Sequence, residues 1–372
     1  MDNCIANSNC YMIKIFITGC FIFLFFSLTA SAQDSTKDAS SLTWSVYVDV
    51  YAAHYTDSLG TGDYQKFPSI SPRSDQFGLN VAMASVKYAA RKVRANASIH
   101  YGDIPLSAWS GKYNFIQEAN AGILLCKNLW LDGGFFRTHF GTEALFPKEN
   151  YTSSVSVPTF FEPYYEAGFR LNYTPSEKLS FYLYALNGYG MYEDNNKKKS
   201  AGLLVTYVFN KKLNIGYSGY YGDDSLQGHH LRLAHNAFLN FKGKKLKVTI
   251  GGDFITQQHS SISNTPGTAS VGSGVFIISY DIKKKARIYS RGEWYNDADG
   301  ILSGVFTDAN NKPTGLKLWG ATTGIEFRPV ETAYIRLEGR LLSTEKDQEI
   351  FYWDGKNKNQ RWETMIHFGI SF

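Results

Sequence analysis

Apolar and polar residues alternate along most of this chain, and the stretch from Trp362 to Phe372 shows the pattern clearly. Trp362, Thr364, Ile366, Phe368, Ile370 and Phe372 occupy alternate positions, and the residues between them are mostly polar or small. Successive side chains of a strand point to opposite faces, so the stretch predicts a strand with one aromatic, apolar face. A strand between lipid and a water-filled lumen has this pattern. Taken alone, the stretch also fits a terminal strand of a soluble sandwich.

The same alternation recurs and predicts sixteen strands, separated in turn by short polar turns and by longer loops. We expect these strands at residues 42–55, 76–88, 93–101, 115–125, 129–140, 164–173, 179–188, 201–209, 213–221, 231–241, 246–256, 270–280, 286–295, 316–327, 333–342 and 362–372. Strands of this length suit a membrane-spanning barrel, whose turns are short on the periplasmic side and long on the outer side.

The predicted fold is therefore all-β: one closed antiparallel transmembrane β-barrel of about sixteen strands over residues 42–372. Every backbone polar group in lipid needs a partner, so the first and last strands must pair. A soluble all-β array of this size rarely alternates long and short connections so regularly. The chain has no linker that would divide it into two domains.

Charged residues fall on one phase of the predicted strands, which we assign to the lumen. The candidate pore-lining residues on the strands are Glu166, Arg170, Arg287, Arg291, Glu293, Arg336, Glu338 and Arg340, and Lys247 and Asp253 share a phase in the same way. The opposite phase holds apolar residues, including Tyr165, Ala167 and Leu337, which we expect to face lipid. A charge on that face would cost about 2–4 kcal/mol at the bilayer centre. An alternative is that the inward charges form a salt network that only supports the wall.

Residues 1–32 read as a secretory signal peptide that is removed. An almost continuous apolar run from Ile15 to Leu28 precedes Ala30-Ser31-Ala32, a small-residue cleavage site. The mature chain would then begin at Gln33, with residues 33–41 as a short periplasmic tail. Ile17-Thr18-Gly19-Cys20 resembles a lipoprotein processing box, but the apolar run continues past it. Cleavage would leave Cys126 without an intramolecular disulfide partner.

Composition narrows the classes of function. Aromatic residues make up 16% of the chain, and the formal net charge is only +5. This charge is too mild to indicate a nucleic-acid partner, and no basic face with interleaved aromatics stands out. No His/Cys cluster with metal-ligand spacing occurs, so we expect no cofactor and no metal.

One segment resembles a known family. His139-Phe140-Gly141-Thr142-Glu143-Ala144, followed by Phe161-Glu162-Pro163-Tyr164-Tyr165-Glu166-Ala167-Gly168, is similar to the OmpL-like β-barrel porins of the bacterial outer membrane. The terminal Phe372 also resembles the targeting signal of outer-membrane barrels, so we assign an assembly role to Trp362, Phe368 and Phe372. The resemblance implies an outer-membrane pore without catalytic residues.

The leading hypothesis is a passive or weakly selective channel for small hydrophilic solutes. One alternative is a structural or adhesive barrel that acts through its outer loops. Another is a barrel-embedded lipid hydrolase, for which His100, His139, His235 and His367 are available but no Gly-x-Ser-x-Gly elbow exists. Expected partners are outer-membrane lipids, the barrel assembly machinery and small solutes. The sequence leaves undecided whether the protein forms a homo-oligomer.

Two further expectations concern the pore itself. Inward arginines slightly outnumber inward glutamates, which predicts a mild preference for anions. By resemblance to sixteen-stranded general porins, the loop at residues 141–163 should fold into the lumen. There Glu143 and Glu149 could meet arginines of the wall.

Overall fold

The computed structural model describes residues 40–372, apart from residues 58–63, 66, 68, 227 and 265. The predicted signal peptide at residues 1–32 lies outside the described residues, as does nearly all of the predicted tail at 33–41. Ser40–Phe372 forms one compact unit. Among the described residues, no helix is both long and apolar enough to cross a membrane.

Sixteen antiparallel strands of the described chain close into a barrel, as the alternation predicts. In barrel order they are β1 (Ser41–Tyr55), β2 (Gln76–Ala89), β3 (Val93–Tyr101), β4 (Ile116–Cys126), β5 (Leu129–Arg137), β6 (Tyr165–Ser176), β7 (Leu179–Leu186), β8 (Ser200–Asn210), β9 (Leu213–Gly222), β10 (Arg232–Lys242), β11 (Leu246–Gln257), β12 (Ala269–Lys283), β13 (Ala286–Asn296), β16 (Lys317–Phe327), β17 (Ala333–Thr344) and β20 (Gln360–Ser371). Short turns and long loops alternate between them.

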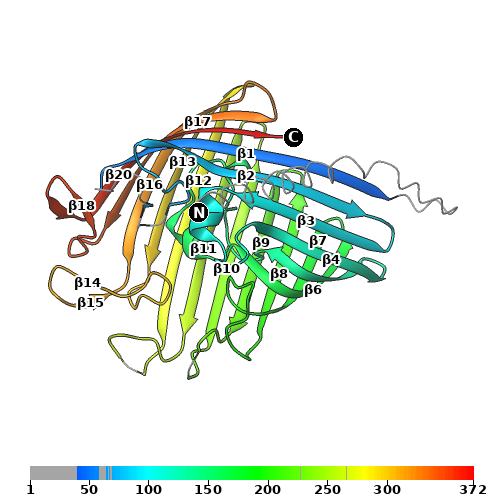
Figure 1. The fold of residues 1–372 in the computed structure, drawn as a ribbon, viewed down its shortest axis with the longest axis horizontal. Coiled ribbons are helices and arrows are strands. Elements are labelled where there is room, and N and C mark those ends of the chain that lie inside the picture. The colour runs from blue at the N-terminus through cyan, green and yellow to red at the C-terminus, as the bar shows by residue number, and fades with distance from the viewer. Residues whose placement is uncertain (1–39, 58–63, 66, 68, 227, 265) are drawn as a thin grey trace, which may run out of the picture. The chain divides into compact units, whose positions relative to one another are not determined.

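The barrel closes where β1 pairs with β20, as the need to satisfy every backbone group requires. The register runs from Tyr47 opposite Ser371 to Tyr55 opposite Glu363. Val46 and Phe372 extend the seam by exchanging two backbone hydrogen bonds of 2.7 and 3.0 Å. Figure 1 shows β1 in blue lying beside β20 in red at this closure.

The long loops contain small elements that the alternation does not predict. They are α2 (Asp103–Ala108), the 3₁₀ turn η1 (Pro147–Glu149), α3 (Val157–Phe161), and the two short hairpins β14 (Phe306–Thr307) with β15 (Pro313–Thr314) and β18 (Phe351–Trp353) with β19 (Lys356–Lys358). Ser156 caps α3 by accepting a hydrogen bond from the Thr159 backbone, and Pro158 suits its first turn.

Strand β5 ends at Arg137, three residues before the predicted end at residue 140. The Thr138 hydroxyl accepts a hydrogen bond from the Phe140 backbone N–H at 3.0 Å. The His139 ring bonds the Glu166 carboxylate at 2.7 Å. These side-chain bonds replace the strand ladder, and the chain leaves the wall there.

The two faces of the wall differ as the sequence predicts. Ile288, Trp319 and Leu337 are about half exposed on the outer face, whereas Arg291 and Glu338, on the opposite phase, are buried inside the barrel. The lipid-facing assignment of Tyr165 and Ala167 is wrong. The Tyr165 ring lies 4.7 Å from Trp109 and 4.5 Å from Tyr192, which belong to two long loops. Ala167 is only 3% exposed because the same loops cover this end of β6.

Candidate functional site: the loop inside the barrel

The long loop between β5 and β6, residues 138–164, enters the barrel as predicted and is held along one side by the inner wall. We call residues 141–163 of this connection the inner loop. Arg336 on β17 binds three of its backbone carbonyls with one guanidinium. Nη1 donates to Pro147 O at 2.8 Å and Thr152 O at 2.7 Å, and Nη2 donates to Asn150 O at 2.9 Å. A planar guanidinium with fixed donors can satisfy several carbonyls at once.

A second set of buried charges holds the next part of the inner loop. Glu338 on β17 accepts the backbone N–H groups of Ser153 at 2.6 Å and Ser154 at 3.0 Å. Arg291 on β13 donates to Ser154 O at 2.6 Å and to Ser154 Oγ at 2.8 Å. Both side chains are at most 2% exposed. These charges therefore serve to fasten the loop.

Glu293 on β13 completes this fastened side. It accepts the Val157 backbone N–H at 2.6 Å, where α3 begins. Its own charge is balanced by Arg340 on β17 at 2.9 Å. Buried charges are tolerated when they are paired and hydrogen-bonded, and Glu293 accepts from both Arg340 and the loop backbone.

The acidic residues of the inner loop meet arginines, as predicted. Glu143 lies 3.2 Å from Arg291, and Glu149 accepts from Arg137 at 2.8 Å. Apolar contacts add to these bonds. Val157 belongs to the same buried cluster as the wall residues around it, and the Phe161 ring stacks on Tyr295 with 5.2 Å between the ring centres.

The opposite side of the inner loop has no buried arginine of this kind among the described residues. It is bonded to the wall where the Asn236 amide donates to the Thr142 hydroxyl at 3.0 Å, and it borders two cavities. The upper cavity, of about 410 Å³, lies between the loop and the inner wall residues Leu204, Thr206 and Phe238. The lower cavity, of about 550 Å³, extends toward the short-turn side of the barrel. Thr142, Glu143 and Ala144 line both cavities. This three-residue segment therefore lies between the two cavities, with the Thr142 hydroxyl against Asn236 of β10.

The lower cavity has a basic lining. Its cationic lining residues are Lys148, Lys242, Lys247, Arg287, Arg328 and Arg336. Glu143 and Glu149 are its acidic lining residues, and each already pairs with an arginine that does not line the cavity. Asn214, Asn240 and Thr249 add neutral polar groups. Such a lining concentrates anions by its field.

Two carboxylates of the wall hold four of these cations in place. Glu326 lies 2.6 Å from Arg336, 2.5 Å from Arg328 and 3.2 Å from Arg287. Asp281 pairs with Arg287 at 2.8 Å and also with Lys247. Four cations thus share two negative charges, so the cluster keeps a positive excess toward the cavity.

The upper cavity contains an unusual acid on the inner loop. One carboxylate oxygen of Glu162, Oε1, is buried and has no hydrogen-bond partner among the described residues. Burial raises the pKa of Glu162 well above its usual range, and the nearby carboxylates of Asp253 and Glu143 raise it further. Burial and the neighbouring carboxylates therefore favour the protonated, neutral form of Glu162.

The other sequence-predicted residues occupy the wall away from the lower cavity. Glu166 is buried against His139, and Arg170 contacts Asp132 at 3.0 Å with its guanidinium over the Phe136 ring. The structure thus separates the predicted set into three groups, of which Glu166 and Arg170 are one. Glu143, Glu149, Arg287 and Arg336 border the lower cavity, while Arg291, Glu293, Glu338 and Arg340 lie on the fastened side.

Comparison with known proteins agrees with this geometry. Residues 41–372 match the model of one protein family, described as "putative beta-barrel porin-2, OmpL-like". The chain belongs to this OmpL-like porin family. A search of curated proteins finds no match.

Solved porin structures share the fold at low sequence identity. The anion-selective porin from Comamonas acidovorans superposes with a TM-score of 0.60 at 9% identity, covering 90% of this chain and 100% of that one. The channel DcaP of Acinetobacter baumannii gives 0.59 at 13%, covering 91% and 99%. OmpT of Vibrio cholerae gives 0.58 at 11%, also covering 91% and 99%. At these identities the likeness shows the fold alone, and the family match places this porin in the outer membrane.

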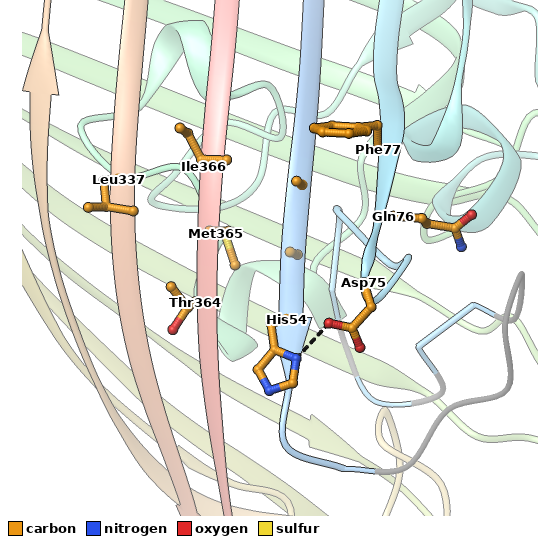
Figure 2. Close-up of a pocket in the computed structure, with 10 residues that line it drawn as sticks. His54, Asp75, Gln76, Phe77, Leu337, Thr364, Met365 and Ile366 are labelled. Atoms are coloured by element: carbon orange, nitrogen blue, oxygen red, sulfur yellow. Dashed lines mark hydrogen bonds and ion pairs between the residues drawn. The ribbon is translucent and has the colours of Figure 1, made fainter.

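The outer wall of the porin has a groove of about 310 Å³ where β1, β2, β17 and β20 meet. Figure 2 shows Phe77, Leu337 and Ile366 around it, with His54 and Asp75 joined at one end at 2.7 Å. Phe77 is 91% exposed. These residues lie on the apolar, outer phase, so the groove faces away from the lumen and is separate from the two inner cavities.

The porin also brings together a serine, a histidine and an aspartate. Ser71 Oγ lies 3.4 Å from Nε2 of His367, whose Nδ1 lies 2.9 Å from Asp49 Oδ1. A hydrolase uses the same residue order, but its nucleophile must reach a substrate. Here all three side chains are 0% exposed, and Asp49 also accepts from Tyr334 and Asn80. The group therefore links loop and wall next to the β1–β20 seam.

Sequence reasoning did not single out several residues that line the lower cavity or pair with its cations. Lys148 lies in a loop, where no periodicity assigns a direction to a side chain. Lys242 ends β10 at a turn and reads as a solvated residue. Glu326 lies on the inward phase of β16. The alternation of β16 places Glu326 inward in the same way that the alternation of β13 places Arg287 inward, so the sequence was sufficient to identify it.

Proposed function

We propose that this porin is a passive diffusion channel for small hydrophilic solutes with a mild preference for anions. Its route runs on the β8–β11 side of the inner loop, through the upper cavity and then the lower one. The observation that carries the proposal is the asymmetric attachment of the loop. Buried arginines and glutamates hold one side against β13 and β17, and two cavities border the other side.

The electrostatics of the route support the anion preference. Lysines and arginines outnumber carboxylates in the lower cavity, and burial raises the pKa of Glu162 in the upper cavity, which favours its neutral form. A pore lined by an excess of one charge favours ions of the opposite sign. The preference is mild because Glu326 and Asp281 neutralise part of the excess.

Several further points belong to the same proposal. Cleavage after Ala32 would deliver the chain to the envelope, and the assembly machinery would read Trp362, Phe368 and Phe372. Trp362 and Phe368 are about half exposed on the outer phase, and Phe372 is 70% exposed, which suits contact with lipid.

A non-enzymatic channel is consistent with the full burial of Ser71, His367 and Asp49, which no substrate reaches. An adhesive barrel acting through its loops is the alternative.

A planar bilayer experiment tests the route. In a Cys126→Ser background, Thr206→Cys places a thiol on the lining of the upper cavity, and Val205→Cys places one on the neighbouring, opposite phase. A charged methanethiosulfonate reagent should reduce the current of Thr206→Cys and leave that of Val205→Cys unchanged. A tenfold potassium chloride gradient should give a reversal potential displaced toward that of chloride. A wild-type barrel that inserts but carries no current would refute the channel.

A further inference from the structure

We infer that the lower cavity is a binding site for small dianionic oxyanions, the chemistry shared by phosphate esters and dicarboxylates. This inference rests on the proposed channel function and adds a saturable site to it. A general preference for anions needs only an excess of charge. A binding site needs charges that are positioned, uncompensated and accompanied by hydrogen-bond donors.

The uncompensated charges are Lys148 and Lys242. Within the described part of the chain, the ammonium of neither side chain has a carboxylate partner. Lys148 extends from the inner loop, and its Nζ lies 4.5 Å above the centre of the Tyr47 ring. Lys242 reaches the cavity from the end of β10. Two separate cations on different elements match an anion with two charges better than they match chloride.

The position of Lys148 is fixed by the residues around it. Its backbone N–H donates to the Tyr47 hydroxyl at 3.2 Å, and Tyr47 is held in turn by Tyr334 at 2.8 Å. On the two sides of Lys148, Pro147 O and Asn150 O are bound by Arg336. The backbone that carries Lys148 is therefore held rigidly beside the cavity that this residue lines, which reduces the entropy lost on binding.

Burial of the Lys148 ammonium supports the inference. Desolvation lowers its pKa, and repulsion from Arg137 and Lys87 lowers it further, while Glu149 raises it. Desolvation thus makes the Lys148 charge costly, and a bound anion would reduce that cost.

The remaining lining suits an oxyanion in size and chemistry. Arg287 and Arg336 add positive charge from guanidinium groups that are also bonded to Glu326. Asn214 and Asn240 add amide groups, and the Thr249 hydroxyl donates to Asn240 Oδ1 at 2.6 Å. The volume of about 550 Å³ lies within the range of small-molecule pockets. It accommodates a sugar phosphate or a short dicarboxylate with water.

The experiment measures block of chloride current by a second anion in planar bilayers, at constant ionic strength. The probes are glucose 6-phosphate and succinate, with gluconate as a monoanion of similar size. We expect the chloride current of the wild-type porin to fall hyperbolically with the concentration of a dianion, and gluconate to have little effect. Block by both dianions supports a general dianion site, and block by only one identifies the phosphate or the dicarboxylate as the preferred class.

The variants Lys148→Met and Lys242→Met test the assigned residues. Each substitution should raise the half-blocking concentration of the dianion about tenfold, which corresponds to a loss of roughly 1.4 kcal/mol in binding free energy. Lys312→Met removes a charge from an exposed loop and should leave the block unchanged. A non-saturating effect, or equal block in Lys148→Met and wild type, would overturn the inference while chloride current still supports the channel. Absence of chloride current in the wild-type porin would instead refute the proposed function.

Discussion

Replacing Arg336 by lysine should loosen the inner loop without changing the charge of the barrel. The Arg336 guanidinium binds Pro147 O, Thr152 O and Asn150 O, and it also pairs with Glu326. A lysine ammonium is compact and lacks the planar fork, so we expect it to keep the Glu326 pair and about one carbonyl. Two charge-assisted hydrogen bonds are then lost.

The magnitude follows from these two bonds. A hydrogen bond to a charged group contributes about 1.5–3 kcal/mol. At the low end, the loss of two such bonds lowers the free energy that holds the loop against the wall by about 3 kcal/mol. Since about 1.4 kcal/mol corresponds to a factor of ten, the population of the detached loop should rise about 100-fold. The backbone N–H groups of Ser153 and Ser154, which donate to Glu338, become exposed in that state.

Hydrogen exchange followed by mass spectrometry measures this population. Peptides spanning residues 147–157 should exchange about 100-fold faster in Arg336→Lys than in the wild type. Arg328→Lys is the matched control, because Arg328 also contacts Glu326 and makes no hydrogen bond to the inner loop in the described part of the chain. Unchanged exchange in an assembled Arg336→Lys barrel would show that Arg336 does not hold the loop.

Three other predictions follow from the same structure. Deleting residues 143–156 should raise single-channel conductance, and an unchanged conductance would place the constriction elsewhere. Deleting Phe372 should reduce the yield of heat-modifiable barrel far more than Ser371→Ala does, because it removes two backbone bonds to Val46 and an outward aromatic ring; equal yields would contradict this. Glu162 keeps its proton in the folded chain above its usual pKa of 4.5, so the unfolded chain binds fewer protons and stability falls as pH rises above about 4.5. Glu162→Gln should remove that part of the decline, and parallel melting-temperature curves for the two proteins would argue against a raised pKa.

The alternation of apolar and polar residues was sufficient to predict the barrel. A strand with charged residues on one phase and apolar residues on the other has a single low-energy placement between lipid and water. Arg287, Arg291, Arg336 and Glu338 could therefore be placed on the inner face from sequence alone. The same local rule set the number of strands and most of their ends, because turn residues interrupt the alternation.

The tertiary structure decided what those inward residues do. Arg291 and Glu338 bind the inner loop, which is more than a hundred residues away in sequence, and no local pattern encodes that distance. Tyr165 fits the outward phase but is covered by other loops. Lys148 has no strand to orient it, so only the folded loop places it over the lower cavity. Alternation reports which solvent a side chain faces, whereas contacts between distant segments depend on packing that arises after the barrel closes.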